Sequence, residues 1–124
     1  MLRRQELTGA ILGAAFEVHS RLGPGLLESA YDLCLGHELT LRGIPFARQV
    51  PVSLTYKGLR LHCAYRIDYV IDQEVVVELK SVDVLLPIHE IQLATYLRIG
   101  GFRIGLLINF NAQRLKDGIV RRVL

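Results

Sequence analysis

Two runs of β-branched and aromatic residues, separated by a short polar turn, constrain the fold of this 124-residue chain more than any other feature. Residues 65–71 and 75–80 alternate in the manner of strands, and Asp72-Gln73-Glu74 joins them. The pattern predicts an antiparallel hairpin. If the loop has three residues, the pairing of the two strands is centred on Gln73, the middle residue of the loop. Asp68 then faces Glu78 directly across the hairpin.

Alternation along the two strands predicts one packed face and one polar face. We expect the packed face to carry Ile67, Tyr69, Ile71, Val75, Val77 and Leu79, and the polar face to carry Asp68, Glu78 and Lys80. Two carboxylates ~4 Å apart repel by about 4 kcal/mol near a protein surface, so a divalent cation or Lys80 must compensate. The alternative is a surface ion-pair cluster, in which Arg66 or Lys80 neutralises the two acids.

The rest of the chain reads as helices before and after the strands. Apolar residues at three- and four-residue steps predict helices over 4–21, 27–41 and 87–99, with strands over 46–56, 59–71, 75–79 and 102–110 and a short strand or extension in 115–124. In the second helix we expect an inner stripe of Leu27, Ala30, Tyr31, Cys34 and Leu41. This order predicts an α/β fold with one mixed sheet flanked by helices.

Composition and length narrow the class of protein. A chain of this length fits one domain over residues 1–124, and we expect a cytoplasmic location because no apolar run nears the ~20 residues of a membrane span. The 51% hydrophobic content is compatible with a homodimer.

Cys34 and Cys63 stand apart, which favours buried free thiols over a zinc site. A net charge of +3 permits a polyanionic partner without requiring one.

Two motifs resemble those of a known family. Asp68 followed by Glu78-Leu79-Lys80 resembles the signature of the PD-(D/E)XK nuclease superfamily, although Ile67 stands where the signature has proline. The segment from Gly25 to Tyr31 resembles the motif that names the GxxExxY family within that superfamily. The order of elements is similar to the restriction-endonuclease-like αβββαβ core.

This resemblance implies a role for each matching residue. Asp68 and Glu78 would bind Mg²⁺, with Mn²⁺ as a substitute, and the Leu79 carbonyl would add an oxygen ligand. Glu28 would approach the same metal from its helix, although a carboxylate in a first helical turn also stabilises the helix dipole without any other role. Lys80 would orient the attacking water or neutralise developing negative charge.

Further residues are implied as supporting ones. Gln92 and Tyr96 are similar to the Q-x-x-x-Y element of recombination-type nucleases, so Gln92 would support catalysis or contact DNA. Tyr31 and Tyr96 would support the site or simply pack. The resemblance thus implies a Mg-dependent nuclease that acts on DNA. The alternative is a catalytically inactive binding or assembly module that keeps the nuclease fold.

Overall fold

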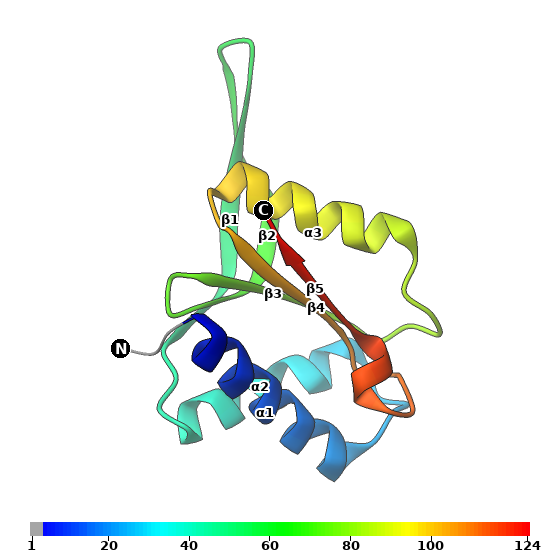
Figure 1. Cartoon of the computed structure of the whole chain (residues 1–124). Coiled ribbons are helices and arrows are strands. Elements are labelled where there is room, and N and C mark those ends of the chain that lie inside the picture. Colours follow the sequence, from blue (N-terminus) through cyan, green and yellow to red (C-terminus); the bar gives the residue numbers. More distant parts are fainter. Residues whose placement is uncertain (1–3) are drawn as a thin grey trace.

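Five strands form one mixed sheet between two layers of helices (Figure 1). The computed structural model describes residues 4–124, without the side chains of residues 63 and 64, so the predicted Cys63 thiol lies outside the described residues. The elements are α1 (Arg4–Leu22), α2 (Glu28–Leu41), β1 (Phe46–Tyr56), β2 (Leu59–Ile71), β3 (Val75–Lys80), α3 (Pro87–Gly100), β4 (Ile104–Asn109), a 3₁₀ helix η1 (Leu115–Gly118) and β5 (Ile119–Val123). The predicted fold class is confirmed.

The strands lie in sequence order, β1-β2-β3-β4-β5. Only β3 and β4 are parallel, because α3 crosses over between them, and every other neighbouring pair is antiparallel. Helices α1 and α2 cover one face of the sheet and α3 covers the other (Figure 1). The central strands are therefore buried on both faces, which explains their nearly continuous apolar sequence.

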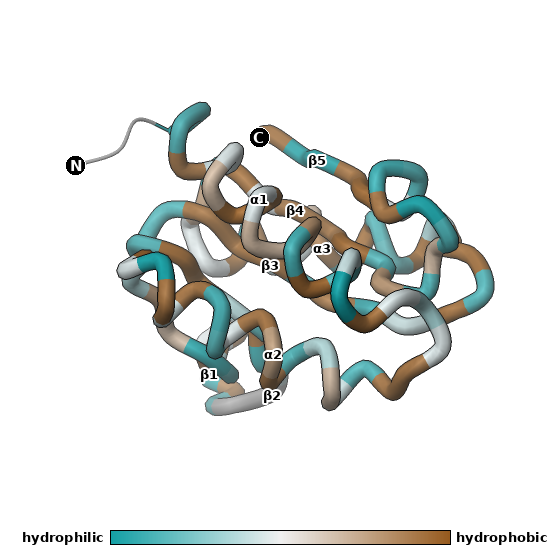
Figure 2. The backbone as a smooth tube through the Cα atoms, turned by 90° about the horizontal axis from the view of Figure 1, so that it is seen from below, coloured by the Kyte–Doolittle hydropathy of each residue, from teal (hydrophilic) through white to brown (hydrophobic). Residues whose placement is uncertain are grey.

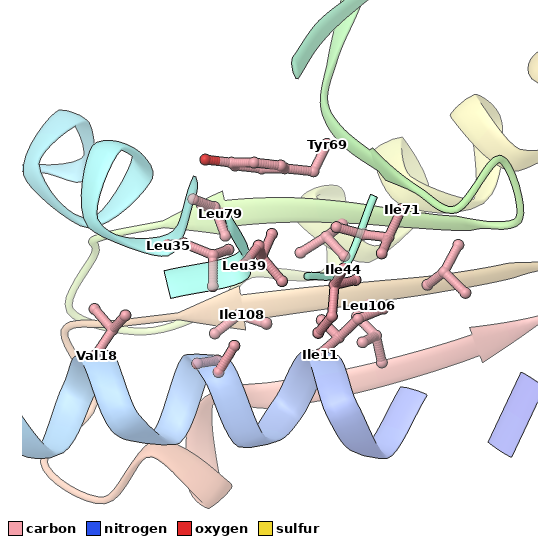
Figure 3. Close-up of a cluster of buried hydrophobic side chains, with 14 of the residues drawn as sticks. Ile11, Val18, Leu35, Leu39, Ile44, Tyr69, Ile71, Leu79, Leu106 and Ile108 are labelled. Atoms are coloured by element: carbon pink, nitrogen blue, oxygen red, sulfur yellow. The ribbon is translucent and has the colours of Figure 1, made fainter. Parts of the chain in front are cut away.

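Each face of the sheet has its own hydrophobic core. Under α1 and α2, side chains such as Ile11 and Leu35 pack against Ile71, Leu79 and Ile108 (Figure 3). Under α3, Leu93 and Leu97 pack against Val70, Val76 and Leu107. Figure 2 shows polar and apolar residues alternating along α1 and α2, with apolar residues predominating in the strands behind them. No helix within residues 4–124 is long and apolar enough to cross a membrane.

The predicted hairpin register is confirmed. Tyr69 pairs with Val77, Val70 with Val76 and Ile71 with Val75, so the pairing is centred on the middle residue of the turn. Asp72 and Gln73 take positive φ values of 49° and 60°, which the tight reversal requires. The backbone ladder between β2 and β3 ends at the Tyr69–Val77 pair, immediately before Asp68 and Glu78.

The predicted inner stripe of α2 is partly wrong. Leu27 and Leu41 are 77% and 67% exposed, whereas Tyr31, Leu35 and Leu39 are fully buried. Leu27 lies before the first helical turn, and the true stripe repeats every four residues from Tyr31. Cys34 lies beside this stripe and is half-buried rather than buried. In the tail the predicted short strand is confirmed as β5, which pairs with β4 and follows the 3₁₀ helix η1.

Ile67 departs from the predicted face. It packs in the core under α3, whereas Tyr69 and Ile71 pack under α1 and α2. Strand β2 loses its pairing with β3 before Ile67, and Gln49, the β1 residue opposite Asp68, has a φ of 52° and is skipped in the β1–β2 register. Because both neighbouring ladders are irregular here, the alternation of faces is interrupted between residues 67 and 69.

Candidate functional site

Two hydrogen bonds join Asp68 to the Glu78-Leu79 segment where β2 separates from β3. The Asp68 backbone N–H donates to Oε2 of Glu78 at 2.7 Å, and the Leu79 N–H donates to Oδ2 of Asp68 at 2.9 Å. The two carboxyl groups thus continue the β2–β3 contact after the backbone ladder has ended. The predicted hairpin places both acids at the point where the strands diverge.

The two acids hold protons more tightly than ordinary carboxyl groups. Glu78 is only 6% exposed, and burial together with the neighbouring charge of Asp68 raises its pKa to about 8. Burial also raises the pKa of Asp68, although the hydrogen bond from Leu79 opposes that change. The two carboxyl groups are close enough for the charge of Asp68 to raise the pKa of Glu78. A proton or a cation shared between them relieves their repulsion.

Lys80 contributes positive charge to the pair without forming an ion pair. It is half-buried at the end of β3. Its positive charge opposes the rise in the pKa values of Asp68, Glu78 and Glu28 that burial causes. In the part of the chain that the structure describes, neither Asp68 nor Glu78 forms a salt bridge with Arg66 or Lys80. The surface ion-pair cluster that the sequence left open is therefore not the arrangement that these residues adopt.

Glu28 enters the same electrostatic neighbourhood from the first turn of α2. Partial burial and then the charge of Asp68 raise the pKa of Glu28, while Lys80 opposes the rise. Among the described residues, however, no three Asp, Glu, His or Cys side chains lie close enough to hold one metal ion. Glu28 thus lies near the two acids without completing a three-carboxylate group with them.

The loop before Glu28 is fixed by the tyrosine of its own motif. The Tyr31 hydroxyl donates to the Gly23 carbonyl at 2.6 Å and accepts from the Leu26 N–H at 3.1 Å. Its ring is fully buried and stacks on Phe110, with centroids 4.8 Å apart and planes 13° from parallel. Tyr31 therefore both packs and holds the turn from which α2 begins, which positions Glu28.

Gln92 and Tyr96 approach from the opposite layer, on α3. Both side chains line the same cavity as Lys80, and burial raises the pKa of Tyr96, with smaller contributions from the charges of Glu78 and Asp68. Tyr96 therefore lies close enough to the acid pair for their charges to affect its pKa, on the α3 side of the sheet. The predicted site residues thus come together from α2, β2, β3 and α3.

Sequence analysis missed an asparagine cluster that joins the chain segments around the site. The buried Asn109, at the end of β4, accepts from the Val82 N–H at 3.1 Å and donates to the Val82 carbonyl at 2.9 Å. Asn111 donates to the same carbonyl and accepts from the Gly25 N–H at 3.0 Å. The sequence signal that could have identified this cluster is Asn109-Phe110-Asn111, in which two amide side chains stand at the end of a buried strand.

Asn109→Ala is expected to destabilise the fold by removing the hydrogen bonds between the end of β4 and Val82. The substitution leaves both backbone groups of Val82 without their Asn109 partner, so we expect unfolding to become easier by about 2–4 kcal/mol. Asn111→Ala is the matched control, because Asn111 is more exposed and the change is expected to cost about 1 kcal/mol. Urea denaturation of both variants measures the difference. Equal stabilities would contradict a bridging role for Asn109.

Asp32 is a second residue that the sequence analysis did not identify. It lies one helical turn after Glu28 on the same face of α2, and its Oδ2 pairs with Arg48 at 2.6 Å. Its Oδ1 is buried without a hydrogen-bond partner among the described residues. The negative charge of Asp32 raises the pKa values of both Glu28 and Asp68. Asp32 therefore adds to the negative potential of the site.

Comparison with known proteins identifies one family. A model described as the PD-(D/E)XK nuclease superfamily matches residues 5–123, almost the whole chain. No curated protein and no solved structure gives a significant match. The matched range contains every residue of the site described above.

Proposed function

The chain belongs to the PD-(D/E)XK nuclease superfamily, and from this premise we propose that it is a Mg-dependent nuclease that hydrolyses phosphodiester bonds in DNA. We assign it to the GxxExxY family, with residues 1–124 forming one nuclease domain. The observation that carries the proposal is the pair of adjacent carboxylates, with Glu78 accepting from the Asp68 N–H and Asp68 accepting from the Leu79 N–H, and with Lys80 two residues after Glu78 on β3. These three side chains occupy the positions of the superfamily signature.

The donor set fits a hard divalent cation. Asp68 and Glu78 present carboxylate oxygens, and burial, together with the charge of Asp68 beside Glu78, raises the pKa of both groups, so a bound cation would stabilise their ionised forms. Mg²⁺ takes one or two protein carboxylates and keeps other positions for water and phosphate oxygens, so two acids suffice. The Leu79 carbonyl is our third candidate ligand. Mn²⁺ accepts the same oxygen ligands and is expected to substitute.

The protein residues then have separate tasks. The metal, when bound, would lower the pKa of a coordinated water and polarise the phosphate. Lys80 supplies a fixed cation that orients the attacking water and stabilises charge on the phosphate oxygens. Glu28, in the first turn of α2, would hold a water near the metal, because no three carboxylates among the described residues lie close enough to hold one ion together. Gln92 and Tyr96 hold the substrate on the α3 side.

A cleavage panel tests this proposal. Purified protein is incubated with single-stranded, duplex, nicked and branched DNA and with RNA, in the presence of magnesium, manganese or chelator. We expect magnesium- and manganese-dependent products from DNA, and none in chelator. A variant carrying Asp68→Asn and Glu78→Gln controls for contaminating nucleases. Cleavage that persists in this variant would show that the activity does not come from the proposed site.

Calorimetric titration with magnesium separates the nuclease from the inactive module. A nuclease is expected to bind the ion, with or without nucleic acid, and to release protons from the acid pair as it does so. Absence of binding under both conditions, together with no cleavage of any substrate, would support a nuclease-fold module that serves in binding or assembly. Cleavage of RNA in preference to DNA would correct the substrate while leaving the chemistry unchanged.

A further inference from the structure

A cavity of about 630 Å³ adjoins the site, between α3 and the hairpin formed by β1 and β2. The hairpin extends away from the sheet as an arm, and α3 lies against its base (Figure 1). Leu54 and Tyr65 line the cavity from the arm, while Gln92 and Tyr96 line it from α3. Lys80 lines it as well, so the cavity begins at a residue of the proposed catalytic set.

The arm turns one apolar face toward this cavity. In the β1–β2 register Val52 is paired with Tyr65, Leu54 with Leu61 and Tyr56 with Leu59, with a register shift between the first two pairs. Val52, Leu54 and Tyr56 alternate along β1 and so share one face, and their three partners in β2 lie opposite them on that face. Val52, near the base, belongs to the core under α3. Tyr65 is 44% exposed, and its ring lies 5.9 Å from that of Tyr96, with the planes inclined by 52°. An exposed aromatic face therefore borders the cavity.

The polar lining of the cavity suits an anionic ligand. Lys80 and Arg98 contribute cations and His89 also lines the cavity, whereas none of the lining residues that the structure describes is an aspartate or glutamate. Gln92 and Thr95 supply an amide and a hydroxyl that can hydrogen-bond to a ligand. Aromatic surface, hydrogen-bonding groups and positive charge are the combination that holds single-stranded nucleic acid, where bases stack and phosphates meet cations.

We propose that this cavity holds an unpaired base next to the scissile phosphate, so that the substrate is a strand with unpaired nucleotides rather than an intact duplex. The inference rests on the proposed nuclease function and specifies its substrate. An intact duplex buries its base faces in the stack and presents sugars and phosphates, which leave Tyr65 and the apolar wall without a partner. An unpaired nucleotide places its base against Tyr65 while Lys80 faces the neighbouring phosphate.

Binding in chelator tests the inference without cleavage. Oligonucleotides that carry a fluorescent 2-aminopurine are titrated with the protein as single strands, as duplexes with an unpaired flap and as blunt duplexes. We expect the first two to bind at least about tenfold more tightly than the blunt duplex, with quenching of the unpaired base. Tyr65→Ala is expected to weaken binding of single strands about tenfold or more, since each stacked base contributes strongly to affinity.

Two matched variants isolate the role of the ring. Tyr65→Phe keeps the aromatic face and is expected to bind single strands within about twofold of the wild type. Tyr56→Ala removes an equally large and more exposed ring, 62% exposed, from the same face of the arm but outside the cavity. We expect it to leave single-strand binding unchanged. Equal losses in Tyr65→Ala and Tyr56→Ala would overturn the proposal, as would equal affinity for blunt duplex and single strand.

Sedimentation tests a second copy of the chain as the competing occupant. A dimer that dissociates in Tyr65→Ala would assign the cavity to self-association and overturn its assignment to a base.

Failure of this inference differs from failure of the nuclease proposal. Cleavage without the single-strand preference overturns only the inference, whereas the single-strand preference without cleavage overturns only the nuclease activity.

Discussion

Asp68→Asn is expected to abolish magnesium-dependent cleavage and to lower magnesium affinity, each by at least about 100-fold, because even residues that only support a metal ligand contribute 10–100-fold. Asparagine has nearly the same shape, and its carbonyl oxygen can accept the hydrogen bond that Leu79 donates to Asp68. The variant removes a buried like charge beside Glu78 and should therefore fold. Initial cleavage rates and magnesium calorimetry measure the two losses.

Lys80→Met is expected to separate catalysis from metal binding. Methionine retains the apolar length of the side chain without its charge, so cleavage should fall about 10²–10³-fold, as for other fixed groups that stabilise a transition state. Magnesium affinity should be unchanged or higher, because a cation has been removed from beside the acids. Lys116→Met, an exposed position on η1, is the control and should retain full activity.

The contrast between these variants is the informative result. Asp68→Asn should lose both magnesium binding and cleavage, whereas Lys80→Met should lose cleavage alone. Full activity in both variants, with circular dichroism like that of the wild type, would remove the acid pair and the lysine from the mechanism. Loss of folding in Asp68→Asn would leave Lys80→Met as the deciding measurement.

The hairpin register could be predicted from sequence because it depends on short-range geometry. A three-residue turn between two alternating strands fixes the pairing, and the observed Tyr69–Val77 pair follows from it. The same reasoning failed two residues further on, at Ile67, because the packing of that residue depends on the irregular partner strand and on α3. Tertiary contacts that interrupt a strand cannot be read from the alternation of apolar and polar residues in its sequence.

The candidate site was predictable only in part for the same reason. Asp68, Glu78 and Lys80 are local to one hairpin, and their order in the sequence suffices to place them together. Asn109 and Asn111 act on segments more than twenty residues away, at Val82 and Gly25. The motif around Tyr31 was recognisable, but its physical cause, two hydrogen bonds to the turn before Glu28, requires the folded backbone.

The stability of the metal-free protein is expected to fall as pH rises. The Glu78 carboxyl has a pKa of about 8 in the folded chain, above its usual value of 4.5, so folding favours its protonated form. A group with a raised pKa contributes its full stability below the unfolded value and loses it as pH rises through the folded value. The unfolding free energy in chelator should therefore decline by a few kcal/mol between about pH 5 and pH 8.5.

Glu78→Gln should remove most of this decline. The glutamine carbonyl can still accept the hydrogen bond from the Asp68 N–H, but the side chain has no charge to bury. At about pH 8.5 the variant is expected to be more stable than the wild type in chelator, although it should have lost cleavage. Glu17→Gln, which breaks a surface pair with Arg21, is the control and should change stability by less than about 1 kcal/mol throughout.

Magnesium should reverse the pH trend in the wild type but not in Glu78→Gln. Because the ion must displace the proton held by the acid pair, its stabilising effect should grow as pH rises, when the carboxylates are ionised and repel one another. Urea denaturation at several pH values, in chelator and in excess magnesium, gives both profiles. A wild-type profile in chelator that rises with pH would contradict the raised pKa of Glu78. It would mean that the site already balances the two negative charges without a proton or a metal, and the case for a cation there would be lost.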